Sequence, residues 1–305
     1  MCRSVVGFTE NMAKESIIVS ACGQESYPYL CDLQASIADS RVVGVADFGV
    51  VDLGLSDNQR QQLVEKKIQV MDPVLLAEAH SQEMSVSSKS QLVRTRLPEL
   101  FPQYQYIIWI DPDSWLQDAS VLHLFLEGAR IDGFCVVPLL DRAYSTGAMR
   151  TQKEFLEMGF GGGADKRFGS HPAISPAAFC GAVSAPHWGV WRDYTLNALR
   201  RHQFREAEQT ALSVLVHEGK LPVHMLPSFC HWACNSRSPN YDPGAKRFVE
   251  PYVPHTPIGI MGHASRSKAN PVLMEYRDGT IQPRSMGYKE HRHNIADALN
   301  LSQVP

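Results

Sequence analysis

The stretch YIIWIDPD, residues 106–113, decides the fold class of this chain. Its first five residues are apolar at every position, whereas a strand with one face in water alternates apolar and polar residues. We therefore expect 106–110 to be a central β-strand that is covered on both faces. The strand ends in Asp111-Pro112-Asp113. Open α/β sheets bind ligands just beyond the carboxyl ends of such strands.

The residues before this strand alternate between short β-branched runs and polar stretches with helical spacing. Such alternation is typical of βαβ units around a mostly parallel sheet. A capping box, in which Ser56 is followed three residues later by Gln59, marks one helix start. The predicted strands are 16–20, 41–46 and 67–70, and the predicted helices are 27–37, 56–65 and 88–97, the last ending before Pro98.

Beyond Asp113 the pattern predicts further strands and helices, namely strands at 133–137 and 179–183 and helices at 188–198 and 206–217. The glycine run GFGGG at 159–163 predicts a mobile loop. It is not a phosphate-binding P-loop, because no Gly-Lys-Ser or Gly-Lys-Thr follows it. The Pro, Asn and Tyr content of 236–257 favours extended coil.

Composition places the chain among globular proteins. It has 305 residues, 44% of them hydrophobic and 20% charged, and its net charge of -3 lacks the basic surface that nucleic-acid binding requires. Its cysteines are odd in number and scattered, which predicts free thiols in a reducing compartment, and Cys230-His231 with Cys234 fits no strong zinc spacing. No run approaches the roughly 18 apolar residues of a membrane span. We expect a cytoplasmic protein, with peripheral membrane attachment as the alternative.

Asp111 and Asp113 are the residues best placed to carry chemistry. Residues two apart in an extended chain share a face, so both carboxylates can point into one space. Pro112 fixes its own φ and biases Asp111 toward extended geometry. Neighbouring carboxylates repel, and a divalent cation keeps both ionised. The pair therefore predicts a metal site, although the triplet alone is equally compatible with a simple turn after a strand.

Residues 16–268 resemble the nucleotide-sugar-dependent glycosyltransferases of the glycogenin and lipopolysaccharide-galactosyltransferase type. The resemblance lies in short motifs that follow one another in the family's order. YIIWIDPD is similar to the strand and DxD motif with which that family holds manganese and the donor diphosphate. The other motifs are FCGAV at 179–183 with Trp191-Arg192, Glu208-Gln209 with Leu212, Leu226-Pro227 with Asn235, and Gly262-His263 with Lys268.

The resemblance implies a GT-A fold, which is an α/β fold with a mixed, mostly parallel sheet flanked by helices in a single domain. It divides the chain into an extension at 1–15, a transferase domain at 16–270 and a tail at 271–305. It implies transfer of a hexose from a nucleotide-diphosphate sugar, most often UDP-linked, with retention of configuration. The acceptor would be a hydroxyl group of a glycan, a lipid-linked glycan or a protein. The 159–169 loop would close over the donor and exclude water.

The resemblance also assigns the site residues. Asp111, Asp113 and His263 would bind Mn²⁺ or Mg²⁺, and an imidazole ligand favours manganese, because magnesium prefers oxygen. The remaining assignments are Lys268 and Lys89 at the diphosphate, Cys180 and Gly181 at the donor sugar, and Glu208 and Gln209 beside the anomeric carbon. Without the resemblance, Lys89, Arg94 and Arg96 read equally well as a solvated helix face and Glu208 as a helix cap.

The chain departs from the family pattern at several motif positions. Cys180 stands where the family has an Asn that contacts the sugar, Glu208 replaces an Asp, and the His263 motif is shorter. One alternative is therefore an inactive GT-A-like domain that binds carbohydrate or a partner. Another is a haloacid-dehalogenase-type phosphatase, which also carries Asp-x-Asp but places it in its first strand.

Overall fold

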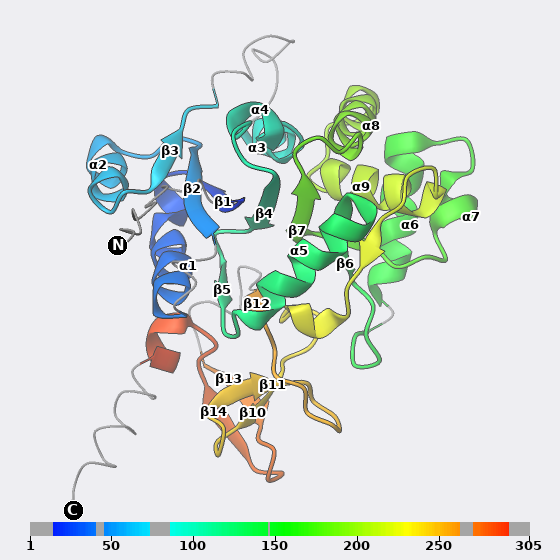
Figure 1. Ribbon diagram of the computed structural model, residues 1–305. Helices are drawn as coiled ribbons and strands as arrows, with labels where there is room; N and C mark the ends of the chain where they lie inside the picture. The colour runs from blue at the N-terminus through cyan, green and yellow to red at the C-terminus, as the bar shows by residue number, and fades with distance from the viewer. Residues whose placement is uncertain (1–14, 41–45, 74–85, 146, 263–270, 293–305) are drawn as a thin grey trace, which may run out of the picture.

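The computed structural model describes residues 15–40, 46–73, 86–145, 147–262 and 271–292. These residues form a main sheet with helices on both faces, and a smaller β-rich region lies below it in Figure 1. Among the described residues, no helix is long and apolar enough to span a bilayer. The described cysteines are all free thiols, as the sequence predicts.

The main sheet has seven strands in the order β3-β2-β1-β4-β7-β6-β8. The strands β1 to β4 are mutually parallel where they pair, whereas β7 runs antiparallel to both β4 and β6. The predicted mixed, mostly parallel sheet is therefore confirmed. Its strands are β1 (Ser16–Cys22), β2 (Ala46–Asp52), β3 (Gln69–Met71), β4 (Tyr106–Ile110), β6 (Phe134–Pro138), β7 (Ile174–Ala182) and β8 (His224–Met225).

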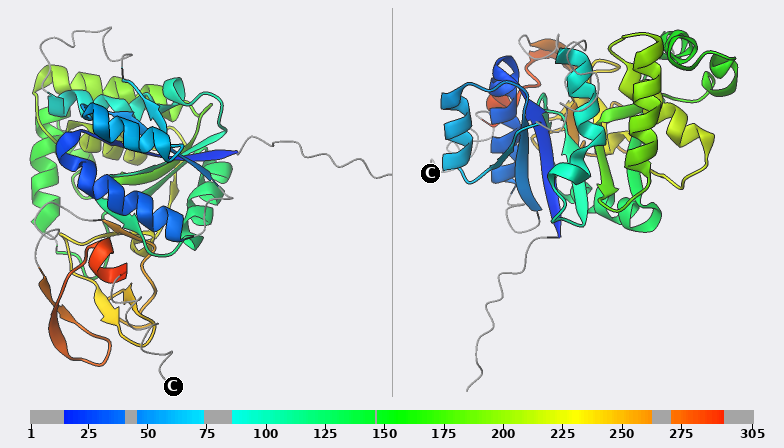
Figure 2. Two further views of the ribbon diagram at one scale, coloured as in Figure 1. Left: turned by 90° about the vertical axis from the view of Figure 1, so that its left-hand side faces the viewer. Right: turned by 90° about the horizontal axis from the view of Figure 1, so that it is seen from above.

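Helices cover both faces of this sheet (Figure 2). One face packs against α1 (Tyr27–Asp39) and α5 (Ser120–Asp132), and the other against α3 (Val86–Thr95), α8 (His187–Arg201) and α9 (Ala207–Glu218). The capping box at the start of α2 is confirmed. The remaining helices are α2 (Asp57–Glu65), α4 (Leu97–Leu100), α6 (Gly147–Phe160), α7 (Ala164–Phe168) and the 3-10 turns η1 (Gln24–Ser26) and η4 (Ser228–Cys230).

The central strand β4 lies between β1 and β7. Its side chains alternate between the two cores: Ile108 and Ile110 pack with α1 and α5, while Ile107 and Trp109 pack with α3, α8 and α9. All four are nearly fully buried. A strand covered on both faces needs apolar residues at every position, which confirms the prediction for 106–110.

A second sheet of three strands begins directly after Asp113. It consists of β5 (Ser114–Leu116), β12 (Ile260–Gly262) and β9 (His231–Ala233), in the order β5-β12-β9. The chain thus passes from the main sheet to the small sheet through Asp111-Pro112-Asp113. This crossing places both aspartates at an edge shared by the two sheets.

Two expectations for the C-terminal third are wrong. The segment 236–257, expected to be coil, contains the hairpin of β10 (Asn240–Asp242) and β11 (Arg247–Val249). The expected tail is packed over 271–292, where β13 (Val272–Glu275) pairs with β14 (Ile281–Arg284). The indole of Trp115 donates to the Met286 carbonyl at 2.9 Å, so this segment covers the small sheet.

One further expectation needs correction, and another falls mostly outside the described residues. The second strand that the structure describes is Ala46–Asp52, and residues 41–45 of the predicted strand 41–46 lie outside the described residues. The glycine run 161–163 is a turn at positive φ between α6 and α7, a backbone that glycine adopts readily. Ala164 and Phe168 of α7 are buried against neighbouring helices, so the segment is a packed helical turn and not an open loop.

Candidate active site

The end of β4 carries Asp111 to the edge of the main sheet. The Asp111 amide donates to the Ala177 carbonyl of β7 at 2.8 Å, and the Ser114 amide donates to the Asp111 carbonyl at 3.0 Å. These two bonds hold the turn between the sheets. Asp111 and Asp113 are both partly exposed there.

Arg94 joins Asp111 to a carboxyl group that is far away in the sequence. Its guanidinium donates from Nη2 to Oδ1 of Asp111 at 2.7 Å and from Nη1 to Oε2 of Glu208. The Trp109 indole donates to the same Oδ1 at 2.7 Å, and Arg94 lies over the Trp109 ring at 4.9 Å. Because both bonds fall on Oδ1, Oδ2 of Asp111 has no partner among the described residues.

Burial dominates the electrostatics of this cluster. It raises the pKa of Glu208 to about 8, more than the nearby Arg94 guanidinium lowers it, and Asp111 adds to the rise. Burial by itself would lower the pKa of Arg94, but Asp111 and Glu208 reverse the effect and raise it. Arg94 therefore stays charged, and ionised Glu208 is costly in the folded protein.

Replacement of Glu208 by glutamine should remove a pH-dependent loss of stability. Because the folded pKa lies above the ordinary value of 4.5, the folded protein keeps a proton that the unfolded chain releases, and stability falls as pH rises from about 5 to about 8. Urea unfolding at several pH values should show the wild type losing on the order of 2 kcal/mol relative to Glu208→Gln over this interval.

Glu218 offers a control of opposite sign. Bonds from Lys220 and Tyr194 lower the pKa of Glu218, so its contribution is present above pH 5 and is lost only as pH falls further. The difference between wild type and Glu218→Gln should therefore stay flat from pH 5 to 8. A flat profile for Glu208→Gln as well would show that burial does not control that carboxyl.

Within the part of the chain that the structure describes, buried polar atoms without partners gather around Asp111. They are Nε of Arg94, Oε1 of Glu208, Oγ of Ser114 and both ring nitrogens of His231. Each unsatisfied buried polar group costs roughly 1–3 kcal/mol. Natural structures carry few such groups, and a cluster of them indicates a place where a bound group supplies the missing partners.

The His231 imidazole leans over a glycine of the small sheet. Gly262 of the central strand β12 pairs with Ser114 of β5 on one side and with Ala233 of β9 on the other, while His231 is level with Ile260 on the same face. A Cβ at Gly262 would lie 2.5 Å from Nε2 of His231, so glycine is required there. Burial lowers the pKa of His231 to about 4, although Asp111 opposes this, and the imidazole stays neutral at pH 7 with a lone pair available.

A cavity of about 180 Å³ opens beside Asp113. One wall is the start of α1, with Tyr29 and Asp32, and the opposite wall is residues 287–290 of the packed C-terminal segment. Asp113 is therefore not enclosed by protein, and a ligand can reach its carboxylate.

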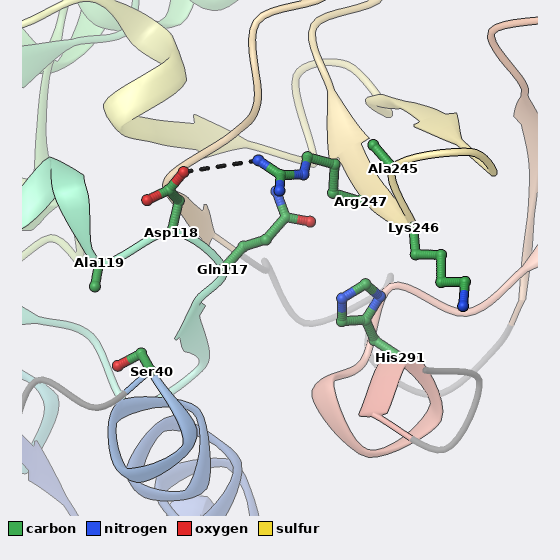
Figure 3. Close-up of a pocket in the computed structure, with 8 residues that line it drawn as sticks. All are labelled: Ser40, Gln117, Asp118, Ala119, Ala245, Lys246, Arg247 and His291. Carbon is green, nitrogen blue, oxygen red and sulfur yellow. Dashed lines mark ion pairs between the residues drawn. The ribbon is translucent and has the colours of Figure 1, made fainter. Parts of the chain in front are cut away.

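A larger cavity, about 480 Å³, lies at the other end of β5 (Figure 3). Arg247 reaches toward Asp118 at 3.9 Å, and Lys246 and His291 lie on the opposite side. The Gln117 amide is already bonded to the Phe248 and Ile258 carbonyls at 2.9 and 2.6 Å. Because β5 separates this cavity from Asp113, it is not the space in front of the aspartate pair.

The sequence matches no protein-family model and no curated protein. Its fold matches the galactosyltransferase LgtC in complex with donor and acceptor sugar analogues, with a TM-score of 0.56 and 16% identity over 94% of this chain and 97% of LgtC. The bifunctional glycosyltransferase WbbM matches with a TM-score of 0.55 and 12% identity over 95% of this chain and 51% of WbbM. An active-site variant of LgtC matches with a TM-score of 0.54 and 13% identity over 92% of this chain and 95% of the variant.

The chain has the GT-A fold. This confirms the fold that the sequence motifs imply. In this GT-A domain the aspartate pair, Arg94 and Glu208 lie at the sheet edge where β4 and β7 meet β5, as the bonds above define.

The predicted site residues fall into three groups. Arg94 links Asp111 to Glu208, and Gln209 follows on α9, where its amide donates to the Ile174 carbonyl at 3.1 Å. Asp113, two residues beyond Asp111, lines the cavity beside α1. His263, Lys268 and the side chain of Lys89 lie outside the described residues. Among the described residues, no group of three potential ligands is close enough to hold a metal ion.

Cys180 and Gly181 do not reach the sheet edge, which corrects their assignment to the donor sugar. Cys180 lies inside β7 between Ile108 and Cys135, fully buried, and burial raises the pKa of its thiol well above the ordinary range. A Cβ at Gly181 would lie 2.5 Å from the Trp188 ring, so this glycine serves packing. The β7 residue opposite Asp111 is Ala177.

Sequence reasoning missed Arg94 and His231. Arg94, which the sequence allowed as part of a solvated face, is the link between Asp111 and Glu208. His231, whose spacing from the neighbouring cysteines fits no strong zinc pattern, is buried, and both its ring nitrogens lack partners among the described residues. The local sequence around His231 gives no signal that its imidazole is buried without partners, because this environment arises only from the pairing of β9 with β12.

Proposed function

We propose that this protein is a metal-dependent glycosyltransferase that moves a hexose from a UDP-sugar to a hydroxyl acceptor with retention of configuration. The observation that carries the proposal is the Arg94–Asp111–Glu208 cluster. It is surrounded by unpaired buried polar atoms, at the ligand-binding edge of a GT-A domain. The structural neighbours LgtC and WbbM are glycosyltransferases, which supports the reaction class.

Asp111, Asp113 and His263 are the proposed ligands of Mn²⁺, with Mg²⁺ as the less suited ion. The donor set fits a divalent cation, because Oδ2 of Asp111 is without a partner, Asp113 lines an open cavity, and neutral His231 lies nearby. When bound, the cation would neutralise charge on the departing diphosphate. Lys268 and Lys89 are proposed to contact the same diphosphate.

Arg94 would fix the orientation of Asp111 and keep Oδ1 occupied, leaving Oδ2 toward the ligand. Glu208 and Gln209 would lie beside the anomeric carbon. In the transfer step the acceptor oxygen forms a bond to the anomeric carbon, while the bond between that carbon and the phosphate oxygen of the donor breaks. The electron pair leaves on the diphosphate, and the hydroxyl proton passes to a phosphate oxygen. Retention requires attack on the face that the diphosphate vacates.

The inactive-domain alternative loses one of its two grounds, because Cys180, taken to replace a sugar-contacting residue, lies in the core. Its other ground, the shortened motif around His263, lies outside the described residues. The phosphatase alternative also weakens, because the aspartate pair follows β4 of a GT-A sheet and not a first strand. Unpaired thiols in the described residues favour the cytoplasm as the compartment. The acceptor would belong to a glycan, a lipid-linked glycan or a protein.

Isothermal titration calorimetry with UDP, with and without Mn²⁺, tests the proposal directly. We expect UDP binding only with manganese, and slow release of UDP from UDP-sugars under the same conditions. A screen of nucleotide sugars for manganese-dependent thermal stabilisation identifies the donor. Release of inorganic phosphate would instead indicate a phosphatase, and binding without any donor turnover would indicate an inactive binding domain.

A further inference from the structure

The cavity of about 480 Å³ at the far end of β5 contains cationic side chains that the proposed transfer reaction does not use. Its volume is typical of a site for a small organic molecule. Gln117, in its wall, follows Asp113 by four residues, and a strand rises about 3.3 Å per residue, so the two lie about 13 Å apart. A ligand held here is therefore distinct from a diphosphate held at Asp111 and Asp113.

Lys246 and Arg247 supply the positive charge of this cavity. Nη1 of Arg247 lies 3.9 Å from Oδ2 of Asp118 (Figure 3), which is too far for a hydrogen bond, and the Arg247 side chain is 43% exposed. Lys246 is also partly exposed and makes no ion pair with the described residues. Both cations therefore present accessible N–H donors to the cavity, and no described side chain occupies them.

The turn between β10 and β11 holds Lys246 in an unusual backbone conformation. Oδ1 of Asp242 accepts bonds from the Gly244 and Ala245 amides at 2.9 and 3.0 Å. Oδ2 of the same carboxylate accepts one from Arg277 at 2.7 Å, so the turn is fixed. Lys246 follows at a φ of 52°, in the left-handed region that glycine and asparagine adopt more readily than lysine. Binding of an anion by the ammonium group would offset the cost of this backbone.

The carboxylates near the cavity already have partners. Oδ1 of Asp118 accepts a bond from the Ser120 amide at 3.0 Å, at the first turn of α5. Asp39, which precedes Ser40 of the cavity wall, forms an ion pair with Arg292 at 2.9 Å. With two cations against one carboxylate among the described residues that line it, the cavity has a net positive charge.

A buried cation behind the cavity wall adds to this charge. His291 lies in the wall, buried against the Phe248 ring at 5.4 Å. Burial lowers the pKa of His291 to about 4, and the nearby Arg284 guanidinium contributes to the decrease. Arg284 stacks on Tyr241 at 3.3 Å, and its Nε and Nη2 have no partner among the described residues. No described carboxylate therefore neutralises Arg284, and its charge favours an anion in the cavity.

We propose that this cavity binds the phosphate monoester group of a small soluble molecule, separately from the aspartate site. The planar Arg247 guanidinium donates two parallel hydrogen bonds to phosphate oxygens, and the Lys246 ammonium provides a point charge. A phosphate monoester carries about 1.5–2 negative charges at pH 7, so it gains more from these cations than a carboxylate does. The inference does not depend on the transferase reaction, because β5 separates these residues from the aspartate pair.

Phosphorus NMR on the full chain, without manganese, tests the site with inorganic phosphate and glucose 6-phosphate as probes. Line broadening should show saturable binding of glucose 6-phosphate. Lys246→Asn and Arg247→Gln should each weaken this binding about tenfold or more, because each removes a charge-assisted hydrogen bond. Asp118→Asn should strengthen it about threefold, because it removes a repelling charge and keeps the oxygen that bonds to α5.

Lys67→Asn is the matched control for Lys246→Asn. Lys67 is an exposed lysine in the turn after α2, has a φ of 59°, and is not part of the cavity lining. The two variants therefore make the same substitution in the same backbone conformation. Lys67→Asn should leave phosphate binding unchanged.

Manganese-dependent UDP binding, measured by calorimetry, should be the same in all of these variants. Phosphate binding that survives Lys246→Asn combined with Arg247→Gln would overturn the site, as would equal weakening by Lys67→Asn or tighter binding of acetate than of phosphate. Binding of neither probe would overturn it too, as would binding only to phosphatidylcholine vesicles that contain phosphatidic acid. Phosphate binding by a wild type that binds no UDP would support this site and overturn the transferase proposal.

Discussion

Replacement of Asp113 by asparagine should reduce manganese-dependent UDP binding by about a hundredfold or more, at least as much as loss of an outer partner of a metal site costs. The substitution keeps the shape of the side chain and removes the charge that the cation requires. Because Asp113 lines an open cavity at the sheet edge and not a core, stability should change by less than about 1 kcal/mol. Calorimetry measures the affinity, and urea unfolding measures the stability.

Asp118→Asn provides the matched control. Asp118 is also partly exposed and follows the opposite end of the same short strand β5, beside the other cavity. This variant should bind UDP and Mn²⁺ like the wild type. Unchanged affinity in Asp113→Asn would remove the aspartate pair from the cation site, and with it the proposed mechanism.

Replacement of Arg94 by methionine should produce the largest loss of stability. Arg94 joins Asp111 and Glu208, and Glu208 is only 2% exposed. Removing one partner of a buried ion pair leaves an uncompensated carboxylate and costs about 3–5 kcal/mol. We expect a decrease in melting temperature of roughly 10 °C at pH 8, measured by calorimetry, together with weaker UDP binding as Asp111 loses its orientation.

Two companion variants sharpen this result. Arg192→Met breaks a surface ion pair between Arg192 and Glu99, whose side chains are 37% and 35% exposed, respectively. This variant should lower the free energy of unfolding by at most about 1 kcal/mol. Adding Glu208→Gln to Arg94→Met removes the stranded carboxylate and should restore part of the lost stability. Equal losses in Arg94→Met and Arg192→Met would show that the cluster is an ordinary surface network.

The sequence indicated the main features of the sheet because burial of a strand produces a recognisable pattern of apolar residues in the local sequence. The unbroken apolar run of β4 followed from its cover on both faces, and the capping box of α2 involves residues three apart. The aspartate pair was likewise visible, since the end of a buried strand is read from neighbouring residues. Glu208 was visible as an acidic residue at a helix start, although only the structure shows its bond to Arg94.

The sequence could not predict the register in which β7 pairs with β4. An extended strand has the same two-residue period at every position, so the motif around Cys180 could not tell which residue lies beside Asp111. The antiparallel pairing of β7 with β4 places Ala177 there and buries Cys180. The C-terminal segment was expected to be a tail for a similar reason, because its partner Trp115 is more than 150 residues away in the chain.

By itself, the sequence determined the α/β class, the central strand and the pair of aspartates that ends it, because these depend on periodicity and on neighbours in the chain. The tertiary structure alone decided that Arg94 holds Asp111 and Glu208, and that the His231 imidazole lies against Gly262, the strand partner of Ser114. Such contacts join segments that meet only through strand order and pairing, and neither leaves a pattern in the local sequence.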